Sequence, residues 1–133
     1  MISAVADTHT AVWYLFNNPK LSATARQVIE QTFKDGNQVA VSAISLAEMV
    51  YLVEKGRIPR SAMGDLISAL ADPNYPLREV PVTGGIAERM QIIPREDVPD
   101  LPDRIIAATG LFYSVPVISR DAKIRAANLQ SIW

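Results

Sequence analysis

The chain has 133 residues, of which 49% are hydrophobic and 20% charged. This composition predicts one globular domain over 1–133, and the apolar runs are too short for a membrane span. The absence of cysteine excludes disulfides, thiolate metal sites and thiol nucleophiles, and it fits a cytoplasmic protein. A formal net charge of -1 gives no overall attraction to nucleic acid, so any such binding would depend on a local basic surface.

Strands and helices are expected to alternate along the sequence. Short apolar runs bounded by turn residues predict strands, and apolar residues three or four positions apart predict helices. In chain order, the expected elements are strand 2–6, helix 10–16, helix 23–34, strand 38–41, helix 44–53, helix 60–71, strand 77–82, helix 84–91, helix 103–113, strand 115–119, helix 121–127 and strand 129–133. Pro81 indicates that its strand lies at an edge of the sheet or ends there. This order predicts an α/β fold with a mainly parallel sheet covered by helices on both faces.

Four acids lie where an expected strand gives way to a helix, or in the first turn of a helix: Asp7, Glu48, Asp103 and Asp121. Ligand sites of parallel sheets lie beyond the carboxyl ends of the strands, so we expect these acids to meet at one edge. Carboxylates about 4 Å apart repel by roughly 4 kcal/mol at an effective dielectric constant of 20. Either some of them stay protonated or a cation joins them. Oxygen ligands favour Mg²⁺ or Mn²⁺, and such an ion can activate a water molecule for attack on a phosphodiester.

Each acid also has a purely structural explanation. Asp7 and Asp121 can cap the helices that follow them. Glu48 stands three residues after Ser45, which is the spacing of a capping box, and Asp103 is a favourable charge at a helix N-terminus. Capping explains each position by itself, but it does not explain why acids recur at all of them.

Several segments resemble the successive motifs of one family. They are Asp-Thr-His-Thr-Ala-Val-Trp-Tyr-Leu at 7–15, Val-Ser-Ala-Ile-Ser-Leu-Ala-Glu-Met at 41–49, Leu-Pro-Asp-Arg-Ile-Ile-Ala-Ala-Thr at 101–109 and Val-Ile-Ser-Arg-Asp at 117–121. The chain resembles PIN domains, in particular the VapC-type toxins of type II toxin–antitoxin systems. The resemblance implies a three-layer α/β/α fold and a Mg²⁺- or Mn²⁺-dependent endoribonuclease. It also implies a homodimer that acts on RNA and is inhibited by a cognate antitoxin, whose C-terminal segment lies across the active site.

The resemblance assigns roles to individual residues. By motif match, the catalytic and metal-binding quartet is Asp7, Glu48, Asp103 and Asp121. Ser119 is the hydroxyl residue that supports this quartet, and Thr8 and Ser45 are candidate supporting donors. We expect the first three acids to hold the principal metal ion and the last to bind it through water or to hold a second ion.

The basic residues beside the acids are candidates for substrate contact. Arg104 and Arg120 each adjoin a quartet acid and could meet RNA phosphates, although such neighbours are often solvated surface pairs. His9 is a candidate for RNA contact, with packing at the helix start as the favoured alternative. Asp100 is expected to be a further, dispensable charge on the loop.

The apolar run after His9 raises the question of a partner surface. Trp13, Leu15 and Phe16 are expected in the core, because aromatic residues of small domains usually lie inside. Tyr14 and Tyr51 are the better candidates for contact with an antitoxin helix.

Other functional classes fit the residues less well. A haloacid-dehalogenase-like phosphatase would need an acid at position 9, which is His9, and a receiver domain would need paired acids where Asp7 stands alone. A non-catalytic PIN-like interaction domain stays open, because the sequence does not show that a metal ion is bound. The RNA target, the antitoxin and the number of metal ions do not follow from the sequence.

Overall fold

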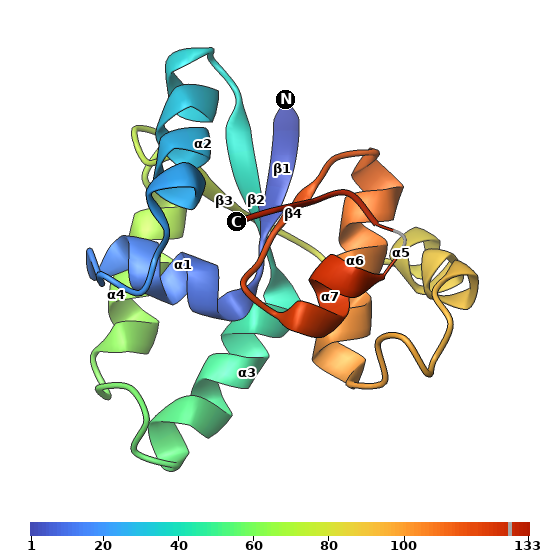
Figure 1. Cartoon of the computed structure of the whole chain (residues 1–133). Coiled ribbons are helices and arrows are strands. Elements are labelled where there is room, and N and C mark those ends of the chain that lie inside the picture. The colour runs from blue at the N-terminus through green and yellow to red at the C-terminus, as the bar shows by residue number, and fades with distance from the viewer. Residues whose placement is uncertain (128) are drawn as a thin grey trace.

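The centre of the molecule is a parallel sheet. In the computed structural model, which describes residues 1–127 and 129–133, five strands pair in the order β3-β2-β1-β4-β5, and each pairing is parallel. The strands are β1 (Ile2–Ala6), β2 (Gln38–Ser42), β3 (Leu77–Val80), β4 (Val117–Ile118) and β5 (Ser131–Ile132). The α/β class and the parallel sheet are therefore confirmed (Figure 1). β3 ends just before Pro81 and lies at an edge of the sheet, as this proline indicated.

Helices connect the strands at the expected places. They are α1 (Thr8–Leu15), α2 (Ala23–Lys34), α3 (Ala43–Glu54), α4 (Ala62–Ala71), α5 (Gly84–Arg89) with a 3-10 turn (Met90–Ile92), α6 (Leu101–Tyr113) and α7 (Ala122–Ala126). Most ends differ from the expected ones by one or two residues, and the expected helix after Pro102 already begins at Leu101. Within the described residues, no helix combines the length and the apolar character needed to cross a membrane.

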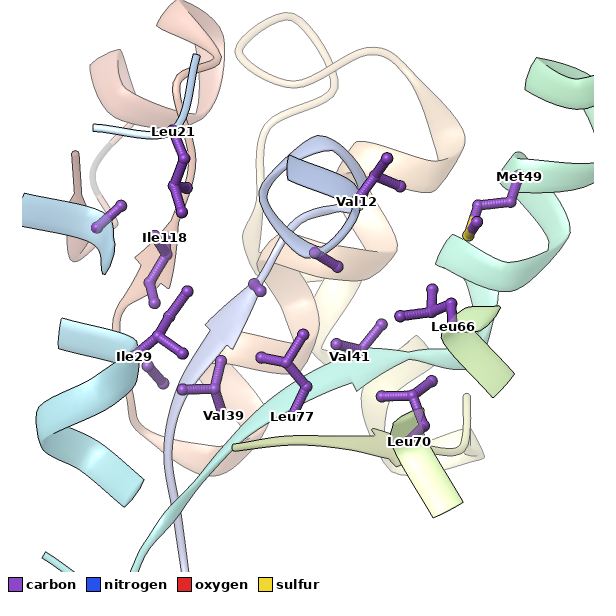
Figure 2. Close-up of a cluster of buried hydrophobic side chains, with 14 of the residues drawn as sticks. Val12, Leu21, Ile29, Val39, Val41, Met49, Leu66, Leu70, Leu77 and Ile118 are labelled. Carbon is purple, nitrogen blue, oxygen red and sulfur yellow. The ribbon is translucent and has the colours of Figure 1, made fainter. Parts of the chain in front are cut away.

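The sheet separates two hydrophobic cores, because successive side chains of a strand point to opposite faces. In β1, Ala4 and Ala6 face one core and Val5 faces the other. Helices α1, α2 and α4 cover the first face, and α5, α6 and α7 cover the second, so the fold has three layers (Figure 1). Figure 2 shows the first core, whose labelled side chains are Val12, Leu21, Ile29, Val39, Val41, Met49, Leu66, Leu70, Leu77 and Ile118.

Helix α6 lies unusually close to the strand that follows it. A Cβ atom on Gly110 would come within 2.8 Å of Val117 Cγ2 and 3.1 Å of the Val115 carbonyl oxygen. Ser114 ends the helix in the left-handed conformation, with φ of 57°, and the chain then enters β4. The absence of a side chain at Gly110 therefore sets how closely the second layer approaches the sheet.

The end of α1 differs from the expectation. Trp13 and Leu15 are partly buried against the first core, but Phe16 is 41% exposed. Helix α1 ends at Leu15, and the chain turns at Asn17, which has a positive φ of 51°. Phe16 is therefore placed at the surface by this turn, and its expected burial was wrong.

Candidate active site

The predicted quartet acids come from four elements that meet at the carboxyl edge of the sheet. Asp7 follows β1, Asp121 follows β4, Glu48 lies in α3 and Asp103 lies in the first turn of α6. The starts of α1, α3, α6 and α7 lie together at this end of the sheet in Figure 1. Topology thus places the acids at the edge where α/β proteins bind ligands.

Asp7 is buried and is held by hydrogen bonds to both of its carboxylate oxygens. Oδ1 accepts from the Thr10 backbone N–H at 2.9 Å, which makes Asp7 the N-cap of α1. Oδ2 accepts from the Ser119 hydroxyl, and the Ser119 oxygen in turn accepts from the Asp121 backbone N–H at 3.0 Å. Ser119 therefore links the acid after β1 to the acid after β4, and the capping explanation of Asp7 holds alongside the predicted site.

Glu48 is oriented by the start of α1. Its Oε1 lies 2.5 Å from Thr8 Oγ1, which also lies 2.9 Å from Ser45 Oγ. A threonine hydroxyl has one proton, which goes to the carboxylate, so the serine supplies the hydrogen of its contact with Thr8. The capping-box explanation of Glu48 was wrong, because Ser42 is the N-cap of α3. The pKa of Glu48 is raised above its ordinary value, mainly by burial and further by the Asp100 charge, and the Thr8 hydrogen bond offsets part of this rise.

Asp103 carries the strongest electrostatic signal of the site. Burial first, and then the charges of Asp100, Asp121, Glu48 and Asp7, together raise its pKa from 3.8 to about 7. The charges of these acids all act on Asp103, so the acids form one cluster. Each negative charge in it makes ionisation of the next carboxyl less favourable.

Asp100 is the residue whose role the sequence prediction missed. Its carboxylate accepts from the Asp103 backbone N–H at 3.2 Å and so caps α6. The signal was available, because an aspartate shortly before a proline is a typical helix start. Asp121 is a cap as well, and its Oδ1 accepts from the Lys123 backbone N–H at 2.8 Å.

The donor set fits a hard divalent cation. It contains only carboxylate and hydroxyl oxygens, which Mg²⁺ and Mn²⁺ prefer. Within the part of the chain that the structure describes, no three of these acids converge closely enough to enclose an ion by themselves. Mg²⁺ usually keeps several of its waters and takes only one or two carboxylates, so an open protein ligand set is compatible with it.

The two arginines next to the quartet have different surroundings. The Arg104 guanidinium donates to the carbonyls of Met90 at 2.9 Å and Ile93 at 3.1 Å, and its buried Nε has no partner among the described residues. A phosphate contact by Arg104 would require these hydrogen bonds to break. Arg120 is exposed, and its guanidinium lies over the ring of Trp13.

A family model described as the PIN domain matches residues 4–129. The chain belongs to the PIN domain family. Ribonuclease VapC22 from Mycobacterium tuberculosis is 29% identical over 126 residues, which is 95% of this PIN domain chain and 92% of the relative. The motif resemblance to PIN domains is thereby confirmed.

Solved structures with this fold include toxins in complex with antitoxins. A toxin–antitoxin complex from Klebsiella pneumoniae contains a chain with 26% identity and a TM-score of 0.63, over 98% of this chain and 97% of that one. VapBC2 from Rickettsia felis, bound to a DNA fragment from its promoter, gives 19% identity and a TM-score of 0.72, over 99% and 98% of the two chains. VapC20 from Mycobacterium tuberculosis gives 17% identity and a TM-score of 0.67, over 96% of each chain. The two matches below 25% identity show the shared fold.

Proposed function

We propose that this PIN domain is a metal-dependent endoribonuclease and the toxin of a toxin–antitoxin pair. The observation that carries the proposal is the meeting of the four acids at one carboxyl edge of the sheet, where burial and the neighbouring charges raise the pKa of Asp103 to about 7. A cluster that holds a carboxyl so far from its ordinary pKa is typical of a functional site. The relative named as a ribonuclease supports RNA as the substrate.

The chemistry that the cluster supports is hydrolysis of a phosphodiester. Bound among the acids, Mg²⁺ or Mn²⁺ would supply a more acidic water molecule and would stabilise the charge that develops on the phosphate. Asp7 and Glu48 are already oriented for this task, because Ser119, the Thr10 N–H and the Thr8 hydroxyl fix their carboxylates. With a pKa of about 7, Asp103 is only partly ionised at neutral pH, and cation binding would favour the ionised carboxylate.

The proposed partner is an antitoxin that covers apolar side chains exposed on α3, the helix that carries Glu48, and on α4. The Klebsiella pneumoniae relative is described in a toxin–antitoxin complex. In this chain, Val50 and Tyr51 of α3 and Ile67 of α4 are between 44% and 66% exposed, and these two helices are in contact. Tyr14 offers less, because it is partly buried beside Tyr75. Tyr51 is therefore the better of the two tyrosines predicted for the interface, and homodimer formation also stays a proposal.

RNA cleavage by the purified protein tests this function. Wild type, Asp103→Asn and Asp97→Asn would be incubated with structured RNA in Mg²⁺, in Mn²⁺ and in chelator. Asp97 is exposed on the loop before α6, so it is a matched control for removing one charge. The proposal expects metal-dependent cleavage by wild type and Asp97→Asn, and none by Asp103→Asn.

The other outcomes are equally informative. Equal cleavage by all the proteins would indicate a contaminant or a different site. No cleavage by any of them, across several RNA classes, would favour the non-catalytic interaction domain.

A further inference from the structure

A cluster of planar side chains lies beside the acids. The rings of His9 and Trp13 are 5.4 Å apart and tilted by 40°, and the rings of Trp13 and Trp133 are 5.9 Å apart and meet edge to face. The guanidinium carbon of Arg120 lies 5.1 Å from the centre of the Trp13 ring. Trp13 is thus in contact with two aromatic rings and one planar cation.

The sheet register explains why this cluster adjoins the site. In the parallel pair of β4 and β5, Ile118 lies opposite Ile132, and the Ser119 N–H donates to the Ile132 carbonyl at 3.1 Å. Trp133, the next residue of β5's chain, therefore leaves the sheet at the same carboxyl edge as Ser119. Arg120 follows this serine, whose hydroxyl donates to the carboxylate of Asp7.

His9 links the cluster to the start of α1, where Asp7 caps the helix. His9 stands in the first turn of α1, two residues after Asp7. The planar groups thus approach the acidic quartet both from α1 and from β4.

Two residues of the cluster are partly buried and two are exposed. Trp13 and Trp133 are partly buried and pack against the first core, which fixes their positions. His9 and Arg120 are exposed, so their outer faces are open to a ligand. A planar group held in place before binding loses little conformational freedom when the ligand arrives.

We propose that His9 and Arg120, supported by Trp13 and Trp133, stack an unpaired nucleobase next to the phosphate that is cut. Unpaired bases stack on aromatic rings and on guanidinium planes, whereas the faces of bases inside a duplex are covered by their neighbours. A stacked base at this position would place the adjoining phosphate over the acids, and Arg120 would offset part of their negative charge. This inference rests on the proposed ribonuclease function and adds a nucleobase-stacking subsite to it.

Tryptophan fluorescence gives a direct test, because both tryptophans of the chain belong to the cluster. The Asp103→Asn protein, which the proposed function expects to bind RNA without cutting it, would be titrated with a short single-stranded RNA of mixed sequence and with the blunt duplex of the same sequence. Stacking should quench the emission with the single strand and much less with the duplex. A second series in Trp133→Phe leaves Trp13 as the reporter.

Substitutions separate stacking from charge. Arg120→Lys keeps the positive charge and loses the plane, and His9→Ala removes the ring. Each should weaken binding of the single strand about tenfold, within the range of about 1–3 kcal/mol that one stacked base contributes. In a protein with an intact quartet, each should raise KM for RNA cleavage. Arg89→Lys, on the exposed end of α5, is the matched control and should change neither quantity.

The outcomes distinguish the subsite from the ribonuclease itself. Two results would refute the stacking subsite and leave the nuclease standing, provided that RNA is cut normally. In the first, these variants bind the single strand as wild type does. In the second, the single strand and the duplex bind equally and quench the fluorescence equally. The cluster would then serve only to fix β5 on α1. If no RNA is bound or cut by any form of the protein, both proposals fail.

Discussion

Replacing Asp103 with asparagine should stabilise the metal-free protein at alkaline pH. In the folded chain, burial and the surrounding acids raise the pKa of this carboxyl from 3.8 to about 7. Between these two values the folded state holds a proton that the unfolded state has released. The free energy of unfolding therefore falls as the pH rises through this window. Above the window, the ionised carboxylate destabilises the folded state by the full free energy that corresponds to the pKa shift. Asparagine has nearly the same shape and no charge, so it removes this cost.

The magnitude follows from the shift. One pKa unit corresponds to 1.36 kcal/mol, so the shift would give an upper limit of about 4 kcal/mol. Asp103 is only partly buried, and solvent screening reduces such values. We therefore expect Asp103→Asn to raise the free energy of unfolding by about 1–2 kcal/mol near pH 8, and by much less near pH 4.5.

Urea denaturation in chelator at these two pH values measures the effect. Asp97→Asn is the control, because its exposed carboxylate lies on the loop before α6. A gain that is the same at both pH values, or a loss of stability at alkaline pH, would show that the charge of Asp103 does not strain the folded protein. Mg²⁺ added at alkaline pH should stabilise wild type more than Asp103→Asn, because the proposed cation site would be complete only in wild type.

Three further predictions concern single contacts. Gly110→Ala should lower the free energy of unfolding by about 1–3 kcal/mol, because the new methyl group meets Val117. Gly64→Ala, which has open space around it in α4, should instead raise the free energy of unfolding by about 0.5–1 kcal/mol. Thermal denaturation of both variants checks this, and equal effects would contradict the packing argument. Thr8→Val should leave the Glu48 carboxylate without its hydroxyl partner and slow metal-dependent RNA cleavage about 10- to 100-fold, and an unchanged rate would show that this hydrogen bond does not orient the acid. Arg104→Met should cost about 1–3 kcal/mol in urea denaturation, because the carbonyls of Met90 and Ile93 lose the guanidinium donor. A fully stable variant with impaired RNA binding would instead support the predicted phosphate contact.

The sequence was sufficient to place the quartet acids because their positions depend on topology. Each lies after a strand or in the first turns of a helix, and the carboxyl ends of parallel strands necessarily share an edge. Alternating strands and helices therefore predicted both the sheet and the side on which the acids lie.

The contacts that orient the acids could not be predicted in the same way. Whether Ser42 or Ser45 caps α3 depends on which residue adopts extended backbone angles, and two serines in the same segment look alike in sequence. Only the folded chain brings Thr8 to Glu48, since the two lie 40 residues apart. The stack around Trp13 depends on the pairing of β4 with β5, strands too short to give a clear pattern.

The sequence pattern also could not predict whether residues at the ends of helices are buried. The hydrophobic run through Phe16 predicted a buried helix, but the turn at Asn17 exposes its last residue. Apolar character alone does not fix the position of a residue whose backbone leaves the helix.

Binding of Mn²⁺, followed by the loss of the electron paramagnetic resonance signal of the free ion, tests most directly whether the acids act as one cation site. The measurement would compare wild type, Asp103→Asn and Asp97→Asn near neutral pH, without RNA. Wild type and Asp97→Asn should bind the ion equally, and Asp103→Asn should bind it about tenfold or more weakly. Equal binding by all the proteins would contradict a single cation site, because the ion would then lie away from the quartet.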